Sequence, residues 1–170
     1  MTPLSWVLRA SIIIATLAVI GAALMTPDAS PIALSWFVAV AAVACAVGAA
    51  VMPDGHAPTA VIALLLVYWV QVVDNDVHVL TLVAAVGLVT VHTASSIEAI
   101  TPPGSRLVSA TYRLWTIRVL AIIVATCVLW LVAVGADRVE HDGGLVLVVL
   151  FGLLAGAAIW VMRLRALGRV

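Results

Sequence analysis

The sequence predicts an all-α, polytopic integral membrane protein: a helical bundle of about six transmembrane helices with very short loops. Of its 170 residues, 65% are hydrophobic and only 9% are charged, whereas a soluble domain carries roughly 25% charged residues. So little charge cannot cover a water-facing surface, so lipid must surround most of the chain. A spanning helix needs about 20 mostly apolar residues, and such runs recur from end to end. We expect one membrane-embedded domain over 1–170, with helices at about 6–25, 32–52, 59–73, 77–96, 105–136 and 145–162.

Turn-forming residues bound the first two helices. Thr-Pro-Asp at 26–28 ends the first run, and Pro-Asp-Gly at 53–55 ends the second, as expected for breaks between helices. An apolar run followed by small residues also fits a signal peptide. The first run is long and five more follow it, so we expect it to stay as the first helix.

The third helix, 59–73, is short, and the fourth, 77–96, ends before the Thr-Pro-Pro-Gly at 101–104. Tyr68 and Trp69 lie near the end of the third, where an aromatic ring with a polar group favours the headgroup level of a bilayer. We therefore predict both as interfacial anchors. A single re-entrant unit made of the third and fourth segments is the alternative to two spans.

The fifth helix, 105–136, is too long for the hydrocarbon core at about 1.5 Å per residue. Its first turns should lie outside the core, where Arg106 and Arg113 share one face. We interpret these turns as an amphipathic collar on the inner surface that contacts lipid phosphates or a cytoplasmic partner, with Arg118 close to the inner edge. On the sixth helix, Gly152 and Gly156 form a GxxxG pattern, which permits close packing within the chain or with a second copy.

The orientation follows from the basic residues, all eight of which are arginine. Threading the chain from an inner N-terminus leaves only Arg138 outside. The inner side receives Arg9, Arg106, Arg113, Arg118, Arg163, Arg165 and Arg169. This excess predicts cytoplasmic N- and C-termini, although the inner 53–58 loop has no basic residue. Scarce Lys and Asn with abundant Ala and Val indicate a GC-rich bacterial genome, and hence a bacterial plasma membrane.

Composition excludes several kinds of chemistry. Without lysine there is no Schiff base to retinal or pyridoxal phosphate, and no P-loop. A net charge of zero gives no reason to expect nucleic acid. Cys45 and Cys127 both fall inside apolar runs, where a free cysteine behaves as a small hydrophobic residue. We expect no cofactor and no metal.

Polar residues gather around the third and fourth helices. Asp74 and His78 would align if the third helix continued through the turn, with Asp76 between them. His92 lies 14 residues after His78, which places the two imidazoles on one face about 21 Å apart. We interpret these residues as a solvated turn and a polar seam between helices. The alternative is an ion or proton path, because intramembrane ionisable groups are functional candidates.

The prediction for function is a non-catalytic scaffold or accessory subunit that acts through partner proteins and contacts membrane lipids. No Asp, Glu, Lys or Arg falls near the midpoint of any predicted span, and no catalytic set or fixed metal-ligand spacing is present. The alternative is a small oligomeric transporter or channel component that uses Asp74, Asp76, His78 and His92. An enzyme acting on a lipid-linked substrate ranks third, because the loops are too short to build a pocket.

Overall fold

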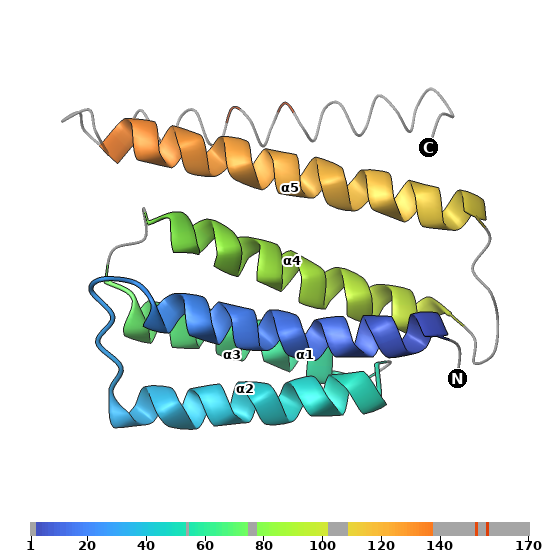
Figure 1. Cartoon of the computed structure of the whole chain (residues 1–170), viewed down its shortest axis with the longest axis horizontal. Helices are drawn as coiled ribbons and strands as arrows, with labels where there is room; N and C mark the ends of the chain where they lie inside the picture. The colour runs from blue at the N-terminus through green and yellow to red at the C-terminus, as the bar shows by residue number, and fades with distance from the viewer. Residues whose placement is uncertain are drawn as a thin grey trace. The chain divides into compact units, whose positions relative to one another are not determined.

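The computed structural model describes residues 3–53, 55–74, 78–101 and 109–137, together with Gly152 and Gly156 (Figure 1). The described residues form five helices, so the all-α prediction is confirmed. These are α1 (Pro3–Leu24), α2 (Ala33–Val51), α3 (Ala57–Val72), α4 (Val79–Ile100) and α5 (Ser109–Asp137). The chain divides into two compact units, Met1–Thr126 and Cys127–Val170. Helices α1 to α4 belong to the first unit.

Four of these helices are long and apolar enough to cross a membrane: α1, α2, α4 and the Trp115–Gly135 part of α5. The protein is therefore a multi-pass helical membrane protein, but the prediction of six spans is wrong for the part that the structure describes. Helix α3 has only 16 residues, or roughly 24 Å at 1.5 Å per residue, because turns at both ends shorten it. The sixth predicted helix, 145–162, lies outside the described residues except for Gly152 and Gly156, which are helical.

Among the described residues, the largest difference from the predicted helix bounds lies at the end of α4. Helix α4 continues to Ile100, four residues beyond the predicted end, and stops at Thr101, whose backbone is extended at φ −98° and ψ 108°. The next residue is proline, which disfavours helical backbone at the residue before it. Helix α5 begins at Ser109, while the predicted start at 105 lies outside the described residues.

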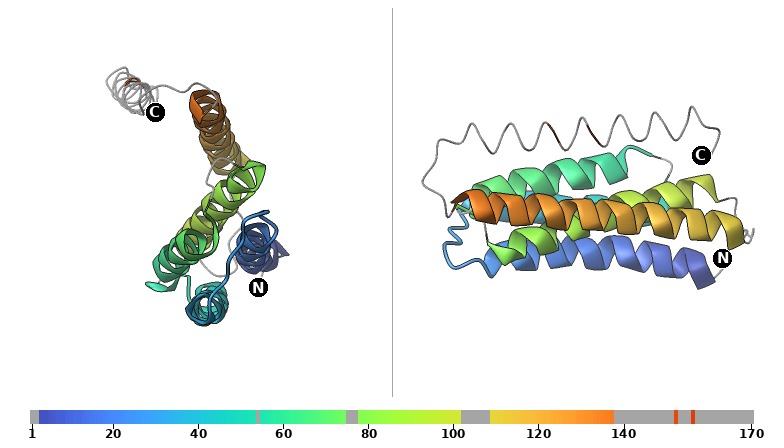
Figure 2. Two further views of the ribbon diagram at one scale, coloured as in Figure 1. Left: turned by 90° about the vertical axis from the view of Figure 1, so that its left-hand side faces the viewer. Right: turned by 90° about the horizontal axis from the view of Figure 1, so that it is seen from above.

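Helices α1 to α4 pack as neighbours in the first unit. Helix α4 packs mainly on α1 and helix α3 mainly on α2, while α1 also contacts α2 and α3. In the end-on view of Figure 2, α1 and α3 lie on either side of α2. At one end of this group the Ser30 backbone N–H donates to the Val72 carbonyl over 3.0 Å. The connection between α1 and α2 thus meets the end of α3.

The core combines small side chains on α2 with large ones on α3. Three alanines on one face of α2, Ala42, Ala46 and Ala49, are fully buried. The four fully buried side chains of α3 follow the spacing of one helix face. They are Val61, Leu65, Tyr68 and Val72. A narrow alanine face lets the bulky face of the neighbouring helix approach closely.

The aromatic residues at the end of α3 were predicted as interfacial anchors, and this prediction is wrong. Tyr68 is 0% exposed and Trp69 is 8% exposed, so neither ring is presented to lipid headgroups as an anchor would be. Both belong to the buried side of an apolar helix that packs on α2. Trp6 and Trp36, by contrast, are 64% and 50% exposed, as expected for side chains that face the bilayer.

Candidate functional site

The first unit contains a partly buried ion pair between the start of α1 and the end of α4. Arg9 Nε donates to Glu98 Oε1 over 2.9 Å, and the two side chains are 20% and 8% exposed. The Ser5 hydroxyl donates to the same oxygen over 2.6 Å. One carboxylate oxygen therefore accepts two hydrogen bonds from α1, and at least one of them is charge-assisted.

Sequence reasoning missed this pair. Arg9 was assigned to the inner membrane edge, and Glu98 fell beyond the predicted end of the fourth helix. The two residues are 89 positions apart, so no local spacing connects them. The available signal was topological: in a bundle of alternating helices, the start of the first helix and the end of the fourth lie at the same end.

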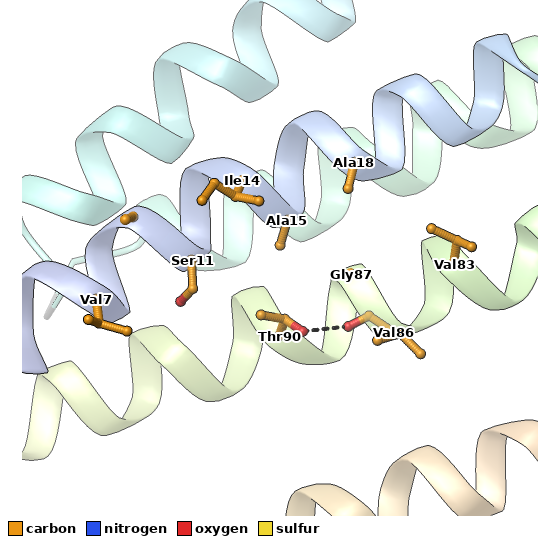
Figure 3. A pocket seen from close by; sticks show the side chains of 10 residues that line it. Val7, Ser11, Ile14, Ala15, Ala18, Val83, Val86, Gly87 and Thr90 are labelled. Atoms are coloured by element: carbon orange, nitrogen blue, oxygen red, sulfur yellow. Dashed lines mark hydrogen bonds between the residues drawn. The ribbon is translucent and has the colours of Figure 1, made fainter.

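A groove of about 450 Å³ runs between α1 and α4 (Figure 3). Figure 3 shows Ser11 and Ala15 of α1 directed toward α4, with Gly87 opposite. The ten lining residues are Val7, Ala10, Ser11, Ile14, Ala15, Ala18, Val83, Val86, Gly87 and Thr90. Small and aliphatic side chains dominate this set, so the groove favours apolar contacts. We call it the α1/α4 groove.

The two hydroxyls of the α1/α4 groove bond to their own helices. The Ser11 hydroxyl donates to the Leu8 carbonyl over 2.7 Å, and the Thr90 hydroxyl donates to the Val86 carbonyl over 2.8 Å. A Ser or Thr that bonds back to its own helix has used its only hydroxyl proton. These hydroxyls can therefore accept hydrogen bonds in the groove but do not offer a donor there.

Several hydroxyls outside the groove bond in the same way. Backbone carbonyls three or four residues earlier accept hydrogen bonds from the hydroxyls of Thr16, Thr26, Ser95, Ser96, Thr101 and Thr126. Backbone bonding of this kind satisfies a hydroxyl inside an apolar environment without a second helix. These hydroxyls are satisfied within their own helices instead of converging on a binding site.

The structure places the residues of the predicted polar seam in different settings. Asp74 is exposed in the turn after α3, where its carboxylate lies 3.5 Å from the Ser30 hydroxyl. His78 is the N-cap of α4, and His92 is exposed on that helix. None of these three lines the α1/α4 groove. Asp76 lies outside the described residues.

His78 has a local structural role that the sequence did not reveal. Its Nδ1 atom accepts a hydrogen bond from the Leu80 backbone N–H over 3.2 Å, which satisfies one of the free donors at the start of the helix. Nδ1 must therefore be unprotonated in this arrangement. Asparagine and aspartate accept the same bond more commonly.

We expect His78→Ala to destabilise the protein by about 1 kcal/mol, the usual loss for an N-cap, whereas His78→Asn should keep the stability. Reversible unfolding in detergent micelles measures both variants. If the two substitutions destabilise the protein equally, capping does not explain this residue.

The remaining predicted sites are only partly described. Arg113 and Arg118 of α5 are exposed, as an arginine that contacts lipid phosphates would be, but Arg106 lies outside the described residues. Space is open beside Gly152 and Gly156, since a Cβ added at either meets nothing within 4 Å. The lipid contacts of the arginines and the packing role of the two glycines stay predictions.

Among the described residues, no three His, Cys, Asp or Glu side chains gather as a metal site would require. Comparison with protein-family models, with curated proteins and with solved structures finds no match.

Proposed function

We propose that this protein is a non-catalytic scaffold or accessory subunit that binds the transmembrane helices of partner proteins. One observation carries the proposal: the groove between α1 and α4 has a mainly apolar lining, and its two hydroxyls and the Glu98 carboxylate at the end of α4 are bonded within the protein. Glu98 pairs with Arg9, and the groove hydroxyls of Ser11 and Thr90 bond to their own helices. A binding surface needs complementary shape, whereas a reaction needs converging polar groups.

The α1/α4 groove suits a helix as its occupant. Ala10 and Ala18, which line the groove and are exposed, leave little side chain between the α1 backbone and the surrounding space. Helices in lipid associate through close van der Waals packing, which small residues permit. A partner helix with a bulky aliphatic face would fill the volume that these residues leave open.

The proposal includes a bacterial plasma membrane and cytoplasmic termini. Its support is the arginine distribution together with the ends of the first unit. Arg9 and Glu98 join the start of α1 to the end of α4, while Ser30 joins the α1–α2 connection to the end of α3. Under the positive-inside rule, the Arg9 end faces the cytoplasm.

Single cysteines at Ser30 and Gly55 test this orientation in a background without Cys45 and Cys127. A membrane-impermeant maleimide should label Ser30→Cys in intact cells and should label Gly55→Cys only after the membrane is opened. The reverse pattern would contradict the orientation. Labelling of both from outside would also contradict a crossing of the membrane by α2, which lies between the two positions.

Affinity purification from native membranes, combined with substitutions in the groove, tests the function. Ala18→Leu places a bulky side chain in the α1/α4 groove, and Ala44→Leu makes the same change on an exposed position of α2. Ala18→Leu should reduce recovery of a co-purifying membrane protein, while Ala44→Leu should not. Equal recovery from both variants would contradict the groove as the binding surface.

The transport alternative predicts a different result. Purified protein in liposomes would then carry an ion- or pH-dependent flux without any partner. That flux would disappear in His78→Asn, which keeps the helix cap but removes the imidazole. Under the scaffold proposal the same vesicles show no flux above protein-free vesicles.

A further inference from the structure

The two hydroxyl groups of the α1/α4 groove are hydrogen-bond acceptors on a surface that is otherwise apolar. The Ser11 hydroxyl donates to the Leu8 carbonyl and the Thr90 hydroxyl donates to the Val86 carbonyl, so each has used its single proton. A hydroxyl oxygen has two lone pairs and can still accept hydrogen bonds. Both residues line the groove, and Figure 3 shows the Ser11 side chain between α1 and α4. An occupant of the groove therefore meets side-chain acceptors there but no side-chain donor.

These acceptors lie in the part of the groove nearer the Arg9–Glu98 ion pair. Ser11 follows Arg9 by two residues and Thr90 precedes Glu98 by eight. At 1.5 Å per residue these separations are roughly 3 Å and 12 Å along the two helices. The lining residues farther from the ion pair have aliphatic side chains or none; they are Ile14, Ala15, Ala18, Val83, Val86 and Gly87. A partner helix would therefore meet polar atoms only toward one end of the groove.

The chemistry of these acceptors narrows the kind of side chain that a partner helix would present to them. A Ser or Thr hydroxyl in an apolar setting bonds back to its own helix. A Lys or Arg would need a counter-ion, and the Glu98 carboxylate is already paired with Arg9. The side chains of Asn, Gln, His and Tyr each bring an acceptor together with the donor, and the groove has no side-chain donor for it. A tryptophan indole N–H is a donor only, and the ring prefers a level close to the headgroups.

We propose that the helix bound in the α1/α4 groove carries a tryptophan whose indole N–H donates to the hydroxyl oxygen of Ser11 or Thr90. This inference rests on the proposed function, because it names the chemistry of the partner that the same groove binds. The indole lies within about two helical turns of the level of the Arg9–Glu98 pair, and the aliphatic face of the partner fills the rest of the groove. The ring adds a large apolar surface to the contact while its N–H is bonded.

Two synthetic helices that differ in one chemical group test the proposal. Each has about 20 Leu and Ala residues between terminal lysines, with one tryptophan two turns from each end, so that either direction of insertion presents an indole. In the control peptide both tryptophans are replaced with benzothienylalanine, which keeps the bicyclic ring and has sulfur in place of the N–H. Energy transfer between dyes on the peptide and on the full-length protein in lipid vesicles measures binding. The tryptophan peptide should bind about threefold to tenfold more tightly, as one neutral hydrogen bond provides.

Removal of the acceptors should abolish this difference. Ser11→Ala and Thr90→Val remove the two hydroxyl oxygens with little change in the shape of the groove. In the combined variant the two peptides should bind equally, and as tightly as the control peptide binds to the wild type. An undiminished preference for the tryptophan peptide in the combined variant would overturn the proposal, because the indole N–H would then bond to some other group.

The Ala18→Leu variant separates a failure of this proposal from a failure of the proposed function. If both peptides bind equally to the wild type and Ala18→Leu weakens both, the groove binds helices without the indole bond, and only the tryptophan proposal is contradicted. If neither peptide binds to the wild type, or if equal binding persists in Ala18→Leu, the groove is not a site for a helix and both proposals are contradicted.

Discussion

Gly87→Ala should destabilise the protein by about 1–2 kcal/mol, because the new methyl group meets α1 directly. A Cβ added at Gly87 lies 2.5 Å from Val19 Cγ2 and 3.3 Å from the Ala15 carbonyl oxygen. Val19 is 1% exposed and β-branched, so its side chain is stiff and has little space to move into. Overpacking typically costs roughly 1–3 kcal/mol, and with so close a contact this cost exceeds the roughly 1 kcal/mol by which alanine favours a helix over glycine.

Gly21→Ala is the matched control for this substitution. Gly21 lies within α1, and a Cβ added there meets nothing within 4 Å. This variant should be as stable as the wild type or somewhat more stable, as measured by reversible unfolding in mixed detergent micelles. If both glycine variants lose stability equally, the loss comes from helix backbone effects and not from close approach of α1 and α4.

A double substitution identifies the contact. Val19→Ala removes the methyl group that Gly87→Ala meets, so the second substitution should cost much less in a Val19→Ala background. An undiminished cost in that background would place the clash at the Ala15 backbone. The fit between these helices would then depend on their backbone separation.

Much of the fold followed from the sequence because apolar length and turn residues are local properties. The runs that became α1, α2 and α4 were located to within a few residues, and their turns contain the Pro, Gly and Asp expected there. The shortness of the third helix was also visible. The end of α4 was placed four residues too early, at residue 96, whereas the helix continues through Glu98 to Ile100.

The candidate sites were harder to predict because they depend on which helices pack together. Gly87 is one of several helical glycines in the sequence, and only the α1–α4 packing distinguishes it from Gly21. Tyr68 satisfies the sequence rule for an interfacial anchor, yet the alanine face of α2 leaves room to bury it. The sequence of one helix does not show which other helix will pack against it, so neither contact could be predicted.

Removing Arg9 should destabilise the protein more than removing its ion-pair partner Glu98. Arg9→Ala leaves the Glu98 carboxylate, which is 8% exposed, without its counter-ion. An uncompensated buried charge should lower the free energy of unfolding by about 3 kcal/mol. Glu98→Ala leaves the longer Arg9 side chain, which is already 20% exposed and can extend toward water. The free energy of unfolding should therefore fall by only about 1–2 kcal/mol. Equal losses would show that the pair matters through packing and not through charge.

Replacing both partners separates stability from specificity. A buried ion pair exchanged for apolar residues of similar volume is often no less stable, so Arg9→Met combined with Glu98→Leu should recover most of the stability lost in Arg9→Ala. The pair joins the start of α1 to the end of α4 and so fixes how these helices align along the α1/α4 groove. If the groove binds a partner helix, the stable double variant should recover less partner in affinity purification than the wild type. Full recovery would mean that packing alone, including the close approach at Gly87, sets the shape of the groove.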